Sequence, residues 1–219
     1  MNKTLLFAVL LTTGLAAHAQ GVKWALFTGP QWTTVRYTIG FDEKKQAVNG
    51  KFGFVAGLSA KADFEGNLYF APAVNYSMKG YTVTFNRISY PPDSLAIDND
   101  VTMHTFEIAA HLQYDFSKQP GHFFMKGGPN IDLQLFGKEK FNRSDNTSKS
   151  RSMSFGYTEY GRFAGGLQLA LGYETKKKAF VQCLYSHGFG SINNADHGPR
   201  IRYRYFNLSL GTYLGKKKG

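Results

Sequence analysis

The sequence has very little cysteine and no apolar stretch long enough to form a membrane-spanning helix. Cys183 is the only cysteine, so it cannot form an internal disulfide. Because it stands in an apolar run, we interpret it as a small hydrophobic residue of the core or the lipid-facing wall. The longest apolar stretch, residues 5–11, falls well short of the roughly 20 residues that a transmembrane helix needs. These absences argue against an internal disulfide and against a helical membrane anchor.

Acidic residues are scarce relative to basic ones. The chain has 26 Lys and Arg against 15 Asp and Glu, so the loss of Lys3 with a cleaved leader leaves 25 against 15, a formal charge of +10. A net positive charge is typical of proteins that bind nucleic acid or an anionic membrane surface. Aromatic residues make up 16% of the chain and glycine occurs 24 times, a mixture that favours β-structure over a soluble helical protein.

The first residues have the pattern of an export signal. Lys3 provides a basic start, the apolar run follows, and small residues end at Ala17-His18-Ala19. This pattern predicts a signal peptide over residues 1–19 and a single domain over residues 20–219. Export argues against a nucleic-acid partner and is typical of a secreted, periplasmic or outer-membrane protein.

The mature chain contains eight runs of alternating polarity and no helical periodicity. The runs cover residues 24–38, 51–64, 67–85, 101–116, 122–136, 155–173, 179–188 and 200–214. Short connections alternate with long polar ones, which cover residues 39–50, 86–100, 137–154 and 189–199. This pattern predicts an all-β fold, an eight-stranded antiparallel up-and-down transmembrane β-barrel with short periplasmic turns and long extracellular loops.

The alternation sorts the side chains into an apolar outer face and a polar inner face. The inner face predicts a lumen charge network of Lys61, Asp63, Glu107, Lys126, Asp132 and Arg162. A soluble ligand barrel of the lipocalin type would show the same alternation with the apolar face inward. Small residues among the charges, and Tyr and Phe at the ends of the apolar stripes, favour the membrane barrel. Prolines within three runs predict bulges or locally open hydrogen bonding at Pro30, Pro72 and Pro129.

The last run carries two arginines in the same parity as its leucines. Arg202 and Arg204 alternate in register with Phe206, Leu208 and Leu210, so in a strand all of them point outward. The pattern predicts that the arginines emerge just above the apolar band, at the level of the lipopolysaccharide headgroups, where guanidinium groups pair with phosphate. The alternative is a pair of solvated arginines at the root of a mobile loop.

Catalytic patterns are weak. Ser186 and His187 are neighbours on a strand and point to opposite faces, so they do not share a proton easily. Glu107 and His111 lie roughly 13 Å apart along one strand at about 3.3 Å per residue, too far for a direct hydrogen bond. Metal-ligand spacing is not found among His104, His122, His187 and His197. We therefore predict no enzymatic activity, no metal and no cofactor.

Several motifs, taken together, resemble the PorT-like outer-membrane β-barrel family of Bacteroidetes. The motifs are LYFAPAVNYSMKG at 68–80, FEIAAHLQY at 106–114, GGPN at 127–130, GGLQLALGY at 165–173 and YSHGFGSIN at 185–193. The resemblance implies the barrel fold and the outer membrane of a Gram-negative bacterium, and the namesake branch is associated with type IX secretion. Ala73 departs from the family, which usually has an acidic residue after the proline of the third strand. Asp93-Ser94-Leu95 resembles the O-glycosylation site of exported Bacteroidetes proteins, which makes Ser94 a candidate site.

Function must be inferred from shape, since eight strands enclose only enough space for side chains. We expect a non-enzymatic, monomeric barrel with a filled lumen, which acts as a structural or interaction protein through its extracellular loops, especially the basic loop 137–154. Outer-membrane lipid and lipopolysaccharide are expected partners, with an envelope or secretion protein as a further possibility. The alternatives are an accessory component of a secretion or envelope-assembly system and a lipid-modifying outer-membrane enzyme.

Overall fold

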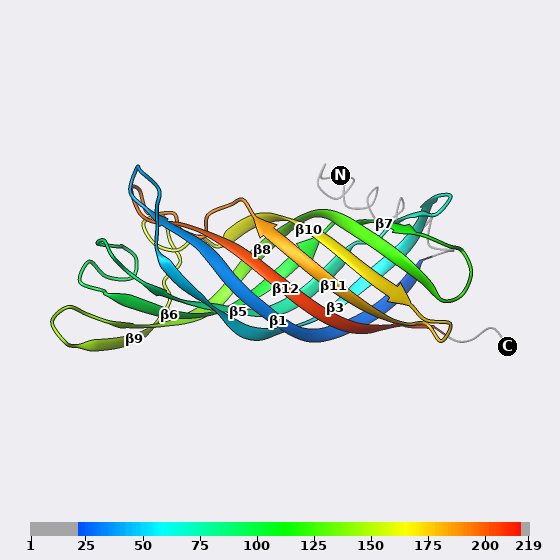
Figure 1. Cartoon of the computed structure of the whole chain (residues 1–219), viewed down its shortest axis with the longest axis horizontal. Helices are drawn as coiled ribbons and strands as arrows, with labels where there is room; N and C mark the ends of the chain where they lie inside the picture. Colours follow the sequence, from blue (N-terminus) through cyan, green and yellow to red (C-terminus); the bar gives the residue numbers. More distant parts are fainter. Residues whose placement is uncertain (1–21, 216–219) are drawn as a thin grey trace, which may run out of the picture.

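A computed structural model describes residues 22–215 as a single antiparallel β-sheet (Figure 1). Its strands are β1 (Lys23–Ile39), β2 (Lys44–Lys45), β3 (Ala47–Glu65), β4 (Leu68–Phe70), β5 (Ala73–Thr84), β6 (Asp98–Ala109), β7 (Leu112–Asp115), β8 (His122–Asn142), β9 (Ser148–Ser152), β10 (Phe163–Glu174), β11 (Ala179–Gly188) and β12 (Arg200–Tyr213). No helix in this part of the chain is long and apolar enough to cross a membrane. The predicted signal peptide lies outside the described residues.

The strand pairings close on themselves. Strand β1 pairs with β3 on one side and with β12 on the other, and the ring continues through β5, β6, β8, β10 and β11. The short strands β4 and β7 pair with each other and with β3 and β8, so they prolong β5 and β6. In Figure 1 the blue β1 and the red β12 accordingly lie side by side, and the strands wind obliquely along a barrel.

The two ends of the barrel differ, as the loop lengths predict. The tight turns after β3, β7 and β10 lie at one end, and the long connections lie at the other (Figure 1). We call these the short-turn end and the loop end. The predicted long loop at 137–154 is wrong in part, because β8 continues to Asn142 and β9 pairs back onto it from Lys138↔Ser152 to Asn142↔Ser148. Apart from the buried Phe141, this hairpin is polar, so it lacks the regular alternation that identifies the other strands.

The predicted run at 155–173 is too long, because β10 begins only at Phe163. The preceding residues cross the mouth of the barrel instead of pairing as a strand, and they bury Met153 and Tyr160 inside it. A loop that fills a barrel mouth places apolar side chains inward, and its sequence therefore mimics the alternation of a strand.

The β-ladders open beside the prolines. Pro72 separates β4 from β5, and the break between β6 and β7 faces Pro129, where the Ala110 amide donates to the Pro129 carbonyl at 3.0 Å. The ladder between β1 and β12 passes from Thr28↔Leu210 to Gln31↔Asn207 and skips Pro30. Local opening is thus as predicted, whereas the register shifts occur elsewhere, within β3 and beside His104.

The apolar face is the outer surface of the barrel. Large exposed apolar side chains cover the wall, among them Leu26, Ile108, Leu112, Ile131, Leu167, Leu169, Leu171, Leu208 and Leu210. The inner face is dominated by polar and small residues between two buried apolar clusters, one toward each end. This is the reverse of a soluble ligand barrel, in which the apolar face lines the interior.

Candidate functional site

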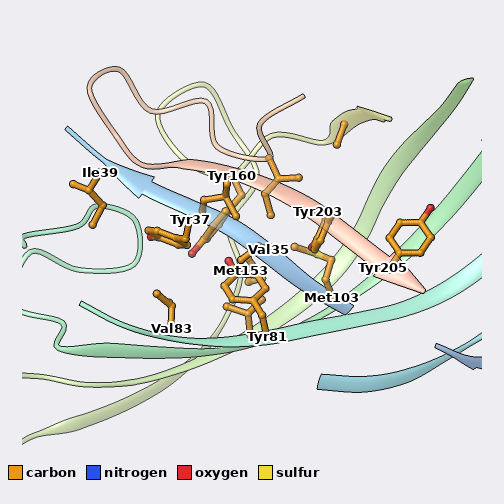
Figure 2. Packing of buried hydrophobic residues seen from close by; sticks show 14 of the residues in the cluster. Val35, Tyr37, Ile39, Tyr81, Val83, Met103, Met153, Tyr160, Tyr203 and Tyr205 are labelled. Carbon is orange, nitrogen blue, oxygen red and sulfur yellow. The ribbon is translucent and has the colours of Figure 1, made fainter. Parts of the chain in front are cut away.

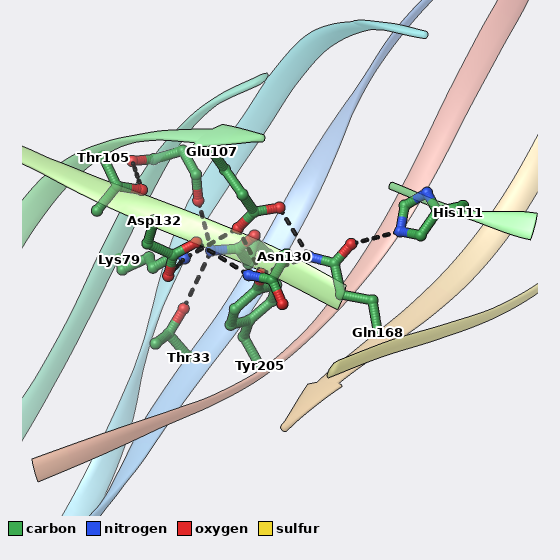
Figure 3. A network of polar contacts seen from close by, with 11 residues as sticks. Thr33, Lys79, Thr105, Glu107, His111, Asn130, Asp132, Gln168 and Tyr205 are labelled. Carbon is green, nitrogen blue, oxygen red and sulfur yellow. Dashed lines mark hydrogen bonds and ion pairs between the residues drawn. The ribbon is translucent and has the colours of Figure 1, made fainter. Parts of the chain in front are cut away.

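A buried ionic network occupies the middle of the lumen (Figure 3). Lys79 on β5 lies with its ammonium 2.6 Å from Asp132 Oδ2 and 3.1 Å from Glu107 Oε2. The same ammonium lies 4.2 Å from the centroid of the Tyr205 ring, and the Tyr205 hydroxyl donates to Glu107. One cation thus links the neighbouring strands β5, β6 and β8, and Tyr205 adds β12.

Gln168 extends the network toward the short-turn end. Its amide donates to Glu107 Oε1 at 2.7 Å, and its carbonyl oxygen lies 2.7 Å from His111 Nε2 (Figure 3). Glu107 and His111 are therefore linked through one amide and do not contact each other directly. This arrangement holds both side chains in place within a filled interior.

The predicted lumen network is partly wrong. Lys61, Glu107, Lys126 and Asp132 are buried inside the barrel, but Asp63 and Arg162 are exposed. Asp63 lies near the end of β3 at the short-turn end, directly before the register shifts, so its side chain is exposed at the edge of the barrel. Arg162 precedes β10, and its guanidinium lies over the Phe155 ring at 4.9 Å. The prediction also omits Lys79, which is the cation at the centre of the network.

A cluster of aromatic and aliphatic side chains fills the loop end of the lumen (Figure 2). Tyr37, Tyr81 and Tyr203 from the wall meet Tyr160 and Met153 from the loop that crosses the mouth. Below this cluster, a cavity beside Asp132 and Tyr205 has a volume of only about 10 Å³, about that of one water molecule. Side chains therefore fill the barrel instead of lining a wide channel.

Hydrogen bonds connect the long loops to one another. The Tyr160 hydroxyl donates to Glu139 Oε2 at 2.8 Å, and Arg151 donates to Glu139 Oε1 at 2.8 Å and to the Pro92 carbonyl at 2.8 Å. Burial, together with the nearby Tyr81 and Glu139, raises the pKa of Tyr160 well above its ordinary value. These contacts join the segments 85–97, 143–152 and 153–162 into one organised surface.

An ion pair joins the first two loops. Both terminal nitrogens of the Arg87 guanidinium donate hydrogen bonds to the carboxylate of Asp42, each at 2.8 Å. The hydrogen bonds from Arg87 hold the pKa of Asp42 below its ordinary value. Such a bidentate pair fixes geometry, even at an exposed position.

A polar cavity opens between the first and last loops at the loop end. It has a volume of about 350 Å³, and its lining includes Phe41, Glu43, Asp196, His197 and Arg200. The rings of Phe41 and His197 are 5.7 Å apart in an edge-to-face arrangement. Both charge signs, an exposed aromatic ring and several backbone groups thus surround one recess.

An arginine patch of Arg36, Arg202 and Arg204 lies on the outer wall, just beyond an aromatic row. Trp32 faces Phe52 on β3 and Phe206 on β12, and Phe206 faces Tyr185 on β11. Arg204 lies two residues from Phe206 toward the loop end and pairs with Thr34 on β1. Two residues farther toward the loop end, Arg202 pairs with Arg36. Arg36, Lys45 and Arg204 line a groove of about 270 Å³.

The arginine patch has few partners of its own. Arg36 lies 3.6 Å from Glu43, while neither Arg202 nor Arg204 forms an ion pair within residues 22–215. The Nε atoms of Arg202 and Arg204 are buried without a hydrogen-bond partner there. Alternation along the strand predicted Arg202 and Arg204 on the outer face. Their proximity to Arg36 and Lys45 was not predicted, because it depends on how the strands pair.

The other candidate residues remain apart. Ser186 is buried in the lumen, whereas His187 points outward, where its Nδ1 lies 3.1 Å from the Tyr185 hydroxyl. Ser94 is exposed in the turn before β6, and its glycosylation stays a prediction.

A charged cluster that sequence spacing did not reveal lies in the lumen at the short-turn end. Asp115, His122 and Glu174 offer ligand atoms that all lie within 4.8 Å of one another. Lys61 Nζ lies 2.5 Å from Asp115 Oδ2 and 3.1 Å from Glu174 Oε2. These residues come from the ends of β7, β8 and β10 and from β3, and the pairing of these strands in the sheet brings them together.

Comparisons with known proteins agree with this architecture. The family model of the outer membrane protein beta-barrel domain matches residues 17–194. No curated protein matches the sequence.

Several solved structures of small barrels are similar to this chain. The attachment invasion locus protein Ail of Yersinia pestis is 12% identical, with a TM-score of 0.48, over 89% of this chain and 100% of that one. The outer membrane protein OprG from Pseudomonas aeruginosa is 10% identical, with a TM-score of 0.48, over 90% of this chain and 97% of that one. Neisserial surface protein A is 12% identical, with a TM-score of 0.43, over 89% of this chain and 99% of that one.

Proposed function

Because the chain belongs to the outer membrane protein beta-barrel domain family, we propose that it acts as a non-enzymatic interaction protein of the Gram-negative outer membrane. The protein is located in that membrane, with its apolar wall against lipid and its long loops outside the cell. Its contacts with a partner are made by those loops, and the barrel serves as their rigid support.

One contrast carries this proposal: the interior is filled, while the loops are organised. Lys79, Glu107 and Asp132 block the middle of the lumen, and the cluster around Tyr160 blocks its mouth. Transport of solutes through such an interior requires the loss of buried ion pairs, which is costly. The loops, in contrast, are held by specific hydrogen bonds, as a recognition surface requires.

The polar cavity beside Phe41 is the proposed contact point. Its volume of about 350 Å³ is within the range of small-ligand sites. Glu43, Asp196, His197 and Arg200 supply donors and acceptors around its rim. A surface glycan, which presents many hydroxyl groups, fits this mixture of polar groups.

Lipopolysaccharide is a second proposed partner, through the arginine patch on the wall. The patch lies about 7 Å beyond the aromatic row, at two residues of about 3.3 Å each, where a barrel meets the headgroups. Guanidinium groups pair with phosphate through two parallel hydrogen bonds. The ring of paired strands is closed, so the barrel needs no second copy to complete its sheet, and we propose a monomer.

Photo-crosslinking in intact cells tests the loop role. A photoreactive side chain replaces Phe41, which is 94% exposed at the cavity, and in a matched strain it replaces Lys177 in a periplasmic turn. Adducts with surface glycan or protein at position 41 alone support the proposal. Adducts at position 177 alone contradict it and favour an accessory role in secretion or envelope assembly. If neither position yields an adduct, the protein does not act through a partner.

A further inference from the structure

The His122 side chain lies in an unusual environment at the short-turn end of the lumen. Its Nδ1 lies 2.9 Å from the Gln119 carbonyl oxygen, so Nδ1 carries the proton and donates it. Its Nε2 is buried without a hydrogen-bond partner in the described part of the chain, and the side chain is only 8% exposed. The ring is thus oriented by a contact outside the cluster, with its second nitrogen directed at two carboxylates.

The two carboxylates are close enough to share an ion with that nitrogen. Asp115 Oδ2 lies 3.0 Å from His122 Nε2, and Glu174 Oε2 lies 3.7 Å from it. A tetrahedral zinc ion with bonds of about 2.0–2.2 Å holds its ligand atoms about 3.3 Å apart. The observed separations therefore approach those of a preformed three-ligand site.

In the ion pairs of this cluster, two carboxylates share one lysine. Asp115 and Glu174 bring two negative charges, whereas Lys61 brings one positive charge. In the same position, the ammonium of Lys61 also lies 4.5 Å from the centroid of the Tyr69 ring.

We propose that Asp115, His122 and Glu174 bind a divalent transition-metal ion at the periplasmic end of the lumen. Zinc suits a set of one imidazole and two carboxylates, with a water molecule in the fourth position. Magnesium and calcium prefer oxygen ligands in larger number. The contact between His122 and Gln119 is the kind of outer contact that orients metal-binding histidines.

Metal binding ties together three strand ends that lie side by side in the sheet, where His122 directly faces Glu174. Asp115 ends β7, His122 begins β8 and Glu174 ends β10. Glu174 retains 13% exposure of its side chain, so an ion can enter from the periplasm. The Lys61 ammonium contacts the same two carboxylate oxygens, so it competes with the metal.

Titration of the full chain, folded in detergent and stripped of metal by a chelator, tests the site. Isothermal titration with Zn²⁺ measures affinity and stoichiometry, and Co²⁺ absorption reports the geometry. The wild type is expected to bind one ion. His122→Gln is expected to weaken binding by more than about 100-fold, since the loss of outer contacts alone costs 10–100-fold. Lys61→Met is expected to bind about tenfold more tightly, because a competing positive charge is removed.

Two further variants keep the test decisive. Glu174→Gln changes the most exposed of the three ligands, and it is expected to weaken metal binding as well. It replaces His122→Gln in the test if that variant does not fold. His104→Gln, which changes a histidine on the outer wall, is expected to bind as the wild type does. Equal affinity in the wild type and in His122→Gln would overturn the proposal. Binding by Lys61→Met but not by the wild type would overturn it too, because the ammonium would then occupy the site permanently.

Discussion

Arg36 on β1 and Arg202 on β12 lie directly opposite each other in the antiparallel ladder, and both side chains are on the outer face. Like charges at facing positions destabilise a sheet. Glu43 offsets the charge of Arg36 at a distance of 3.6 Å. Arg204, two residues from Arg202 on the same face of β12, adds a third positive charge. We propose that this cationic row borders the membrane, where phosphate groups of lipid neutralise it.

Joint replacement of Arg202 and Arg204 by Gln tests this relationship. We expect the purified barrel to retain less lipopolysaccharide and to lose the rise in unfolding temperature that added lipopolysaccharide gives the wild type. Lys176→Gln with Lys177→Gln removes the same charge from a periplasmic turn and should change neither quantity. Unchanged retention in the arginine variant would identify Arg202 and Arg204 as ordinary charges at the root of a loop.

Lys79→Met should destabilise the barrel strongly. The substitution leaves Glu107 and Asp132 buried without the cation that they share, and breaking a buried pair in this way costs about 3–5 kcal/mol of unfolding free energy. Urea unfolding, followed by the different gel mobility of the folded and boiled protein, measures the change.

Lys51→Met is the matched control for that experiment. Lys51 pairs with Asp100 near the surface, where an ion pair contributes about 1 kcal/mol or less. If both lysine variants unfold at the same urea concentration as the wild type, the lumen network does not hold the barrel together.

Cys183 provides a direct probe of the outer wall. It is exposed on β11, where it faces Leu171 on β10 and Leu208 on β12. A nitroxide attached there should collide often with oxygen dissolved in lipid and rarely with a water-soluble nickel chelate. Ser94→Cys with Cys183→Ser moves the label to an exposed turn and should reverse the pattern. High nickel accessibility at Cys183 would show that this face of the barrel meets water.

The ion pair between Asp42 and Arg87 should make the loop surface sensitive to acid. The pKa of Asp42 is lowered by Arg87, so the stabilisation is complete above the ordinary pKa of an aspartate and is lost as the pH falls through the lowered value. A nitroxide at Phe41 in the Cys183→Ser background should become more mobile in that acid range. Asp42→Asn should show no such transition, and an identical transition in this variant would assign it to another group.

The alternation of side chains made the wall of this barrel predictable from sequence. Glu107 and Asp132 fall inside, and Arg202 and Arg204 fall outside, because a strand turns successive residues to opposite faces. The same rule fails where pairing becomes irregular. Asp63 lies at the end of β3, directly before a register shift, and Arg162 precedes its strand, so both side chains are exposed instead of buried in the lumen.

Contacts between distant segments were beyond the reach of the sequence. His122 meets Asp115, seven residues before it, and Glu174, 52 residues after it, because three strand ends converge. The hairpin of β8 and β9 is polar apart from Phe141 and shows no hydrophobic period. Arg36 joins Arg202 only through the pairing of the first and last strands, which depends on closure of the whole ring.

Single-channel recording in planar bilayers tests the central claim of a filled barrel that acts through its surface. The buried ion pairs of Lys79 and the cluster around Tyr160 leave a lumen cavity of about 10 Å³ between them. The wild-type protein, confirmed as folded by its heat-dependent gel mobility, should therefore show no stable large open state. Steady, wide conductance that passes small solutes would contradict the filled interior and assign the protein to the pores.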